Sequence, residues 1–316
     1  MAVDAEPDFL SQADPYRREL LAHCYRMLGS VHDAEDLVQE TMLRAWRGYD
    51  KFEGRSSLRT WLYRIATTQC LTALENRGRR PLPTGLGGPS DTGGLPLEKR
   101  DEVPWLEPMP SDQEDPATIV ASRESTRLAF VAALQYLPAK QRAVLILRDV
   151  LAWRAAEVAE LLGTTTAAVN SALQRARAQL EVAPKPDDVV EPTTEDKRRL
   201  LARYVAAFER KDVDAIVALL AEDAVWEMPP FTTWFRGQEQ VARHLTSQCP
   251  GGPGDFRFVP VEANGEPALG MYLRDEDGVF RPFALQAFTV RGTRYSHVVS
   301  FFDHRLFDTF GLPGTL

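Results

Sequence analysis

Polar and cationic side chains that could contact DNA bases gather in residues 155–180, AAEVAELLGTTTAAVNSALQRARAQL. Apolar residues recur at helical spacing on both sides of Gly163, and the threonines at 164–166 can cap a second helix. Amide, hydroxyl and guanidinium groups on that helix could hydrogen-bond to base edges in a major groove. These groups belong to Asn170, Ser171, Gln174, Arg175 and Arg177. The pattern predicts a helix-turn-helix, although a helical hairpin with solvated arginines would show the same spacing.

The charge of the chain is unevenly distributed. Its formal net charge is -8, which by itself would disfavour binding to duplex DNA. Residues 55–80, however, carry six cations and one anion, and residues 122–180 carry eight cations and four anions. Residues 81–121 hold two cations and eight anions. Two basic helical windows are therefore joined by an acidic segment, which is compatible with nucleic-acid binding.

The elements that must position these side chains fall into three folded parts. Residues 15–80 show helical periodicity interrupted near Gly29 and by a loop before a third helix at 58–75, and helices resume over 117–182. Between them, residues 81–116 contain eight prolines, which excludes helix and indicates a linker. After residue 194 come two amphipathic helices and five strand-like runs, which predicts an α+β domain.

The composition further restricts the class of protein to which the chain can belong. Three widely spaced cysteines show no metal-ligand spacing, so neither a metal site nor a disulfide framework is expected. We see no signal peptide and no apolar run long enough to span a membrane, and we expect a cytoplasmic protein without a membrane partner. No cofactor motif is present, and no cofactor is expected.

Three runs in order resemble a known family. DAEDLVQETMLRAW (33–46), FEGRSSLRTWLYRIATTQCL (52–71) and residues 134–180 are similar to bacterial sigma factors of the sigma-70 family, in particular the extracytoplasmic-function group. Residues 200–230, 235–245 and 306–313 resemble the SnoaL-like, NTF2-like cone fold. The implied fold is multidomain: two all-α sigma domains, a region 2 helical bundle and a region 4 helix-turn-helix, followed by an α+β cone domain.

The resemblance implies domain limits and partners. Region 2 would span residues 11–80 and region 4 residues 117–182, and the acidic linker between them, residues 81–116, carries a WLEP segment. A second linker would span residues 183–193, and the regulatory cone domain residues 194–316. The implied partners are promoter DNA and core RNA polymerase, through its β′ clamp and β flap. The protein would be nucleoid-associated when it is bound to polymerase.

Site residues follow from the same resemblance. Binding to the polymerase clamp is expected from one face of the helix at 34–46, and recognition of the promoter -35 element from the second helix of the helix-turn-helix. Aromatic and cationic side chains at 52–64 would hold the melted -10 element. The clamp set is Asp33, Asp36, Gln39, Glu40 and Arg44; the -35 set is Thr166, Asn170, Ser171, Gln174, Arg175 and Arg177; the -10 set is Phe52, Arg55, Arg59, Trp61, Tyr63 and Arg64. Trp61 also lies at helical spacing with Ile65, which favours a core position for its ring.

Two departures from the family pattern concern DNA binding. Family members commonly have Asn and Asp where this chain has Thr68 and Thr72, and basic residues where it has Asn170 and Ala172. Fewer cations on the recognition helix predict a different -35 sequence and weaker phosphate binding.

The C-terminal domain is expected to act in cis, by contact with the linker and the sigma domains. Trp105, Leu106 and Pro108 are the expected interdomain docking residues; the alternative is that Trp105 only anchors its own loop. Trp226, Trp234, His297 and Asp303 are candidates to line a pocket for an unidentified small ligand. The competing functions are a small-molecule enzyme of the cyclase or isomerase type tethered to a DNA-binding module, and a repressor acting without polymerase. No paired acid and base is evident, so catalytic residues are not assigned, and a repressor has no use for the clamp-like helix.

Overall fold

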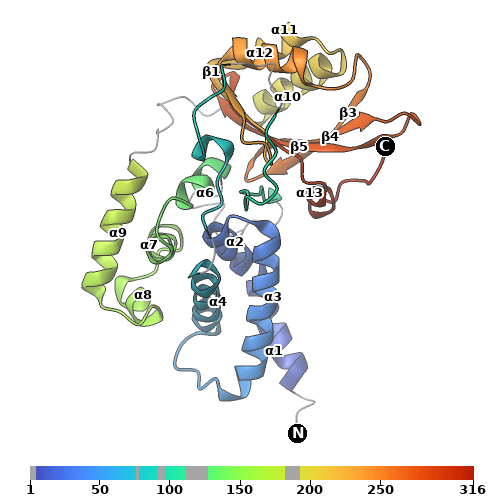
Figure 1. Ribbon diagram of the computed structural model, residues 1–316. Coiled ribbons are helices and arrows are strands. Elements are labelled where there is room, and N and C mark those ends of the chain that lie inside the picture. Colours follow the sequence, from blue (N-terminus) through green and yellow to red (C-terminus); the bar gives the residue numbers. More distant parts are fainter. Residues whose placement is uncertain (1–4, 76–77, 92–96, 112–126, 182–192) are drawn as a thin grey trace. The chain divides into compact units, whose positions relative to one another are not determined.

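The computed structural model describes residues 5–75, 78–91, 97–111, 127–181 and 193–316 (Figure 1). The chain divides into two compact units. The helical unit comprises Met1–Arg80 and Leu106–Lys185, and the C-terminal unit comprises Pro81–Trp105 and Pro186–Leu316. We call residues 5–80 the first helical domain, 127–181 the second helical domain, 81–126 the linker and 193–316 the C-terminal domain. The linker thus contributes to both units.

Three longer helices build the first helical domain: α2 (Arg17–Leu28), α3 (Val31–Gly48) and α4 (Leu58–Glu75). A shorter helix, α1 (Ala5–Ala13), precedes them. Gly29 ends α2 in the left-handed conformation (φ 71°), and the Ser30 hydroxyl caps α3 by accepting from the Asp33 amide. The predicted break at residue 29 and the predicted helix at 58–75 are confirmed.

The second helical domain consists of α6 (Leu128–Leu134), α7 (Ala139–Leu145), a π-helical turn (Ile146–Val150), α8 (Ala155–Leu161) and α9 (Thr166–Glu181). Gly163 adopts φ 60° between α8 and α9, and the Thr165 hydroxyl accepts from the Ala168 amide at 3.2 Å. Val158, Val169 and Leu173 are buried. The predicted helix-turn-helix therefore forms as expected, with Leu161 buried and Leu162 half-exposed at the end of its first helix. The part of the predicted helix before residue 127 lies outside the described residues.

A six-stranded sheet of order β2-β1-β6-β5-β4-β3 is the centre of the C-terminal domain. Its strands are β1 (Leu220–Glu227), β2 (Trp234–Arg236), β3 (Phe256–Ala263), β4 (Glu266–Arg274), β5 (Phe280–Arg291) and β6 (Arg294–Phe301). β1 and β6 are parallel, and the other neighbours are antiparallel. Five strands were predicted; the three-residue edge strand β2 was too short to show alternation.

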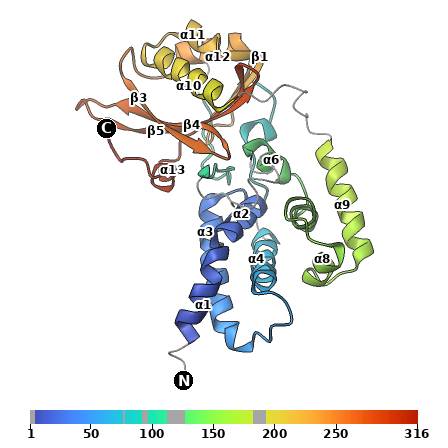
Figure 2. The same ribbon diagram turned by 180° about the vertical axis from the view of Figure 1, so that it is seen from behind.

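Helices α10 (Thr194–Glu209), α11 (Val213–Val217) and α12 (Gln238–Ser247) lie together against the sheet, as Figures 1 and 2 show. Tyr204 and Phe208 of α10 and Leu245 of α12 enter the core beside Phe288 of β5. A last short helix, α13 (Arg305–Thr309), follows β6. This is the α+β architecture expected from the sequence. Among the described helices, none combines the length and apolarity needed to cross a membrane.

Candidate functional site

The recognition helix α9 presents the expected -35 residues to solvent. Thr166, Asn170, Ser171, Gln174, Arg175 and Arg177 are all exposed. Buried Val169, Leu173 and Ala176 hold the opposite face of the helix in the domain. Because the apolar and polar residues occupy different faces, this helix can contact DNA without unfolding its own core.

Arg177 differs from the other residues of this set. Its guanidinium forms two hydrogen bonds to the Asp149 carboxylate, at 2.8 and 2.7 Å. Asp149 thereby raises the pKa of Arg177, first through the hydrogen bond and then through its charge. Arg177 thus braces α9 against the π-helical turn, whereas no hydrogen bond or ion pair engages the Arg175 side chain within the described part of the chain.

Two of the six -10 candidates, Phe52 and Arg55, lie in the loop before α4, and a third, Trp61, lies in the first turn of α4. The Phe52 ring stacks on Trp61, with ring centroids 4.9 Å apart and an interplanar angle of 28°. Both rings are half-buried, and Arg55 is exposed and paired with Glu53. Trp61 also packs near Gly48, so its ring is shared between a local aromatic pair and the end of α3.

The other three -10 candidates are engaged within the helical unit. Arg59 binds the Glu19 carboxylate through Nε and Nη2 at 2.8–2.9 Å. Tyr63 is fully buried, and its ring lies 5.4 Å from Trp153 of the second helical domain. Arg64 donates to Glu160 of α8 at 2.7 Å. The second helical domain therefore covers part of the α4 face that carries these residues.

Arg142 of α7 joins the two helical domains more firmly. Its guanidinium donates to the Met27 carbonyl in α2, to the Gln135 side chain at 2.8 Å and to the carbonyls of Gln135 and Leu137 at 3.2 Å. Burial lowers the pKa of Arg142 to about 10. Because the charge is buried and bonded to several carbonyls, losing this side chain would leave acceptors of both domains unsatisfied.

The clamp candidates lie on α3. Asp36, Gln39 and Arg44 are exposed, and Glu40 bonds to Arg44 at 2.5 Å. Asp33 forms an ion pair with Arg80 at the end of the first helical domain. Two large apolar side chains of the same helix, Leu43 and Trp46, are 45% and 44% exposed and are not among the predicted site residues. At spacings of three and four residues they continue the face of Asp36 and Gln39, and large exposed apolar groups of this kind often mark binding surfaces.

The end of the linker is held on the helical unit by Glu107. Its carboxylate accepts from Ser30 Oγ at 2.7 Å and contacts His32 Nδ1 at 2.9 Å. Its backbone amide donates to the Gly29 carbonyl, and its carbonyl accepts from Tyr25. Burial alone would raise the pKa of Glu107, but the hydrogen bonds from His32 and Ser30 and the nearby charges outweigh burial and lower it.

The docking candidates flank Glu107. Leu106 and Pro108 are buried in the helical unit. Trp105 belongs to the C-terminal unit, is half-buried, and donates from its indole nitrogen to the Arg100 carbonyl. This bond stays within the linker itself.

The preceding part of the linker is hydrogen-bonded to the C-terminal domain. The Thr84 amide donates to the buried Glu227 carboxylate at 2.7 Å, and Trp234 Nε1 donates to the Gly87 carbonyl at 3.0 Å. Residues 98–100 then pair with the β1–β2 loop through a Lys99–Phe231 bridge. The polar composition of the linker did not indicate these individual contacts, because most of them use backbone atoms.

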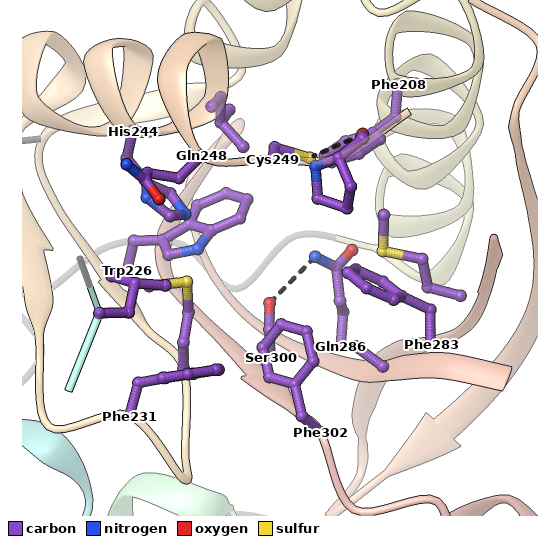
Figure 3. Close-up of a pocket in the computed structure, with 16 residues that line it drawn as sticks. Phe208, Trp226, Phe231, His244, Gln248, Cys249, Phe283, Gln286, Ser300 and Phe302 are labelled. Atoms are coloured by element: carbon purple, nitrogen blue, oxygen red, sulfur yellow. Dashed lines mark hydrogen bonds between the residues drawn. The ribbon is translucent and has the colours of Figure 1, made fainter. Parts of the chain in front are cut away.

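An apolar cavity of about 310 Å³ lies in the C-terminal domain (Figure 3). Trp226 is among its lining residues, whereas Trp234, His297 and Asp303 are not. His297 instead contacts Glu227 at 2.7 Å, and Asp303 pairs with Arg305. Across the described residues, no cluster of three or more His, Cys, Asp or Glu side chains could hold a metal ion.

An exposed recognition helix in the second helical domain, joined to a first helical domain and a fused α+β domain, is the architecture of a DNA-binding protein. Family models match in the same order: Sigma-70 region 2 at residues 13–80, Sigma-70 region 4 at 127–180 and a SnoaL-like domain at 201–305.

Known relatives agree with these matches. The chain is 57% identical to the ECF RNA polymerase sigma factor SigG of Mycobacterium tuberculosis, covering 100% of this chain and 86% of SigG. It is 31% identical to SigJ of the same species, covering 89% of this chain and 88% of SigJ. The crystal structure of M. tuberculosis SigJ matches with a TM-score of 0.64 and 26% identity, covering 96% of this chain and all of SigJ.

The chain belongs to the extracytoplasmic-function sigma factors. It is an alternative RNA polymerase sigma factor that directs promoter-specific transcription initiation, and it carries a C-terminal SnoaL-like domain. The first and second helical domains are its regions 2 and 4.

Proposed function

We propose that the C-terminal domain regulates this sigma factor in cis by holding the linker between regions 2 and 4. The observation that carries the proposal is the backbone pairing of the linker with the β1–β2 loop. The Thr232 amide donates to the Glu98 carbonyl at 3.0 Å, and the Arg100 amide donates to the Pro230 carbonyl at 2.9 Å. A segment paired in this way cannot move freely, so the domain that holds it controls how far apart its ends can travel.

Promoter binding requires regions 2 and 4 to separate. The -10 and -35 elements lie about 25 base pairs apart, or roughly 85 Å along B-form DNA at about 3.4 Å per base pair. In the helical unit, by contrast, Arg64 of α4 and Glu160 of α8 are in direct contact. We therefore interpret this arrangement as a closed form in which both DNA-binding surfaces cannot act on one promoter together.

Glu107 limits how far the closed form can open. While Glu107 stays on Ser30 and His32, the chain that leads from residue 111 to region 4 is residues 112–126. A chain of that length spans at most about 50 Å, and the whole linker from 81 to 126 about 150 Å. Release of the linker from both units would thus give region 4 the reach that a promoter demands.

The contact surfaces follow from the exposed residues. Region 2 would bind the polymerase β′ clamp through the α3 face of Asp36, Gln39 and Arg44, with Leu43 and Trp46 as apolar anchors. Region 4 would bind the β flap and the -35 element. The -10 element would contact the Phe52–Trp61 pair and Arg55 first, and Arg59, Tyr63 and Arg64 after the domains separate. Such a protein works where its polymerase is, in the cytoplasm.

We assign the C-terminal domain a regulatory role and no catalytic one. The titratable side chains that line its cavity are His244 and Cys249, without a partner carboxylate among the lining residues described. The buried carboxylate of Glu227 is instead bonded to Thr84 of the linker and to His297. This use of Glu227 supports a structural role in linker attachment.

The test compares promoter-specific transcription by core polymerase with the full-length protein and with a version that ends near residue 182. Higher activity of the shortened protein means that the domain inhibits, and lower activity means that it assists. Full-length Glu107→Gln, with Asp101→Asn as an exposed linker control, separates linker release from the loss of a domain. Equal activity of the full-length and shortened proteins at all polymerase concentrations would contradict regulation in cis.

A further inference from the structure

The cavity of the C-terminal domain has the size and lining of a small-molecule site. Its volume of about 310 Å³ falls at the lower end of the range for ligand pockets, about 300–1,000 Å³. Its walls are mainly the side chains of Phe208, Trp226, Met228, Phe231, Phe283 and Phe302. Figure 3 shows the aromatic rings of Trp226, Phe231 and Phe302 around the same space.

Two buried polar atoms in this lining have no hydrogen-bond partner within the described structure. They are the indole Nε1 of Trp226 and Nδ1 of His244, from residues that are 3% and 4% exposed. The indole N–H can only donate, so it lacks an acceptor. An unmade hydrogen bond at a buried donor is costly, and an acceptor atom supplied by a ligand would satisfy it.

The remaining lining excludes a charged ligand. The Gln286 amide is already bonded, donating to Ser300 at 3.0 Å and accepting from Tyr204 at 3.2 Å. Burial, with the nearby Lys211 charge, lowers the pKa of His244 to about 4, and burial raises the pKa of the Cys249 thiol. Both groups are therefore neutral at physiological pH, and the described lining contains neither a carboxylate nor a Lys or Arg side chain that could pair with a ligand charge.

We propose that this cavity binds an uncharged, largely apolar ring compound that carries one hydrogen-bond acceptor, and that Trp226 Nε1 donates to that acceptor. The aromatic walls supply the binding energy, and the indole N–H sets the orientation.

The linker forms part of the same site. Leu97 lines the cavity, and the next residues of the linker pair with the loop that carries Phe231, another wall residue. A ligand that contacts Leu97 favours the attached linker, and an attached linker in turn favours the ligand. This coupling rests on the proposed control of the sigma factor through its linker, whereas ligand binding itself does not.

Binding is tested on the full-length protein with three probes of one shape: 2-acetylnaphthalene, 2-isopropenylnaphthalene, which lacks the acceptor, and 2-naphthoate, which is charged. We expect the ketone to bind about tenfold more tightly than the alkene and the carboxylate to bind weakest. With ¹³C-methyl methionine labelling, the ketone should shift Met228 and Met271, which line the cavity, and leave Met27 and Met42 unchanged. Equal affinities for the ketone and the alkene, or no shift at Met228 and Met271, would overturn the proposal.

A conservative variant checks the donor. Trp226→Phe keeps an aromatic wall and removes the N–H, so the preference for the ketone over the alkene should disappear while the alkene still binds. A preference that persists in Trp226→Phe would assign the acceptor to another group and refute the role of Trp226.

Coupling is measured by hydrogen exchange at the Thr232 and Arg100 amides, which donate across the linker contact. The ketone should slow their exchange, and Leu97→Ala should weaken binding about fivefold and abolish the slowing. Leu86→Ala, at a linker residue that is 45% exposed and outside the cavity lining, serves as the control. Exchange that does not respond to the ketone would refute the coupling while leaving the binding result intact. Because no polymerase is present, these outcomes do not depend on the transcription test.

Discussion

The hydroxyl of Ser30 donates a 2.7 Å hydrogen bond to the carboxylate of Glu107, 77 residues further along the chain. The same hydroxyl accepts from the Asp33 amide and so caps α3, the helix that carries the proposed polymerase-binding face. A carboxylate at a helix N-terminus is also favoured by the helix dipole. One serine thus ties the end of the linker to the start of that helix.

Replacing Glu107 by Gln should loosen this attachment. The variant keeps the size of the side chain but loses its charge and one acceptor, in a site that is 9% exposed. We expect the contact to weaken by about 1–3 kcal/mol, because hydrogen bonds to a buried charged group are worth about that much. Native-state hydrogen exchange at the Glu107 amide, which donates to Gly29, measures the effect. Asp101→Asn, in an exposed pair with Lys99, should leave this amide unaffected.

Acid should abolish the difference between wild type and Glu107→Gln. The pKa of Glu107 is lowered in the folded protein from its ordinary value of 4.5. A carboxylate with a depressed folded pKa contributes stability that is fully present above its unfolded pKa. That contribution is lost as the pH falls through the lower folded value. Urea unfolding at a series of pH values should show a constant difference near neutrality that shrinks below about 4.5; a difference that grows on acidification would contradict the assigned direction.

Gly29 allows three segments to meet, and Gly29→Ala should be strongly destabilising. An added Cβ would lie 2.9 Å from Gln135 Cδ and 2.9 Å from Leu106 Cδ1, at a residue with φ 71°. Gly163→Ala is the matched control, because its φ is 60° and nothing lies within 4 Å. We expect about 1 kcal/mol for the control from backbone strain alone, and about 2–4 kcal/mol at Gly29 from strain plus overpacking. Thermal unfolding measures the stability of both variants. Equal losses of stability would show that the side chains around Gly29 move to accommodate the added Cβ at little cost.

Local signals in the sequence were sufficient for most of the fold. Gly29, Ser30 and Gly163 mark helix ends through their own backbone or capping chemistry, and the apolar stripe of α9 identifies its buried face. Such features depend on neighbours three or four residues away, so periodicity reveals them. The exposure of Asn170 and Gln174 followed from the same stripe.

The engagement of individual site residues could not be predicted in this way. Tyr63 has the type expected of a base-stacking residue, yet it is buried against Trp153, 90 positions away. Glu107 looked like one acid in an acidic linker, although its carboxylate accepts from Ser30. Both outcomes depend on long-range packing, which composition and spacing do not encode. Only the apolar residues of the WLEP segment indicated from the sequence that this part of the linker docks on a folded part of the protein.

The Arg64–Glu160 pair should contribute little to closure by itself. Its side chains are 42% and 74% exposed, so water and salt screen the charges. A double-mutant cycle with Arg64→Ala and Glu160→Ala should give a coupling energy below about 1 kcal/mol at physiological salt. The buried contacts of Tyr63 and Arg142 would then hold the domains together. A coupling energy of several kcal/mol, measured by unfolding, would instead show that this surface pair is the main interaction that holds the two helical domains together.

Arg175 and Arg177 should respond differently in promoter binding, although both are exposed on α9. Arg177 is already paired with Asp149, whereas Arg175 is not engaged by described residues and is available to phosphate or base. Arg175→Ala should weaken binding of the polymerase holoenzyme to a -35 element and reduce the slope of log affinity against log salt by about 1. Arg177→Ala should change that slope less, because the Asp149 carboxylate already pairs with the charge of Arg177. Filter binding at several salt concentrations distinguishes the two, and equal slopes for both variants would show that the Asp149 pair breaks when DNA binds.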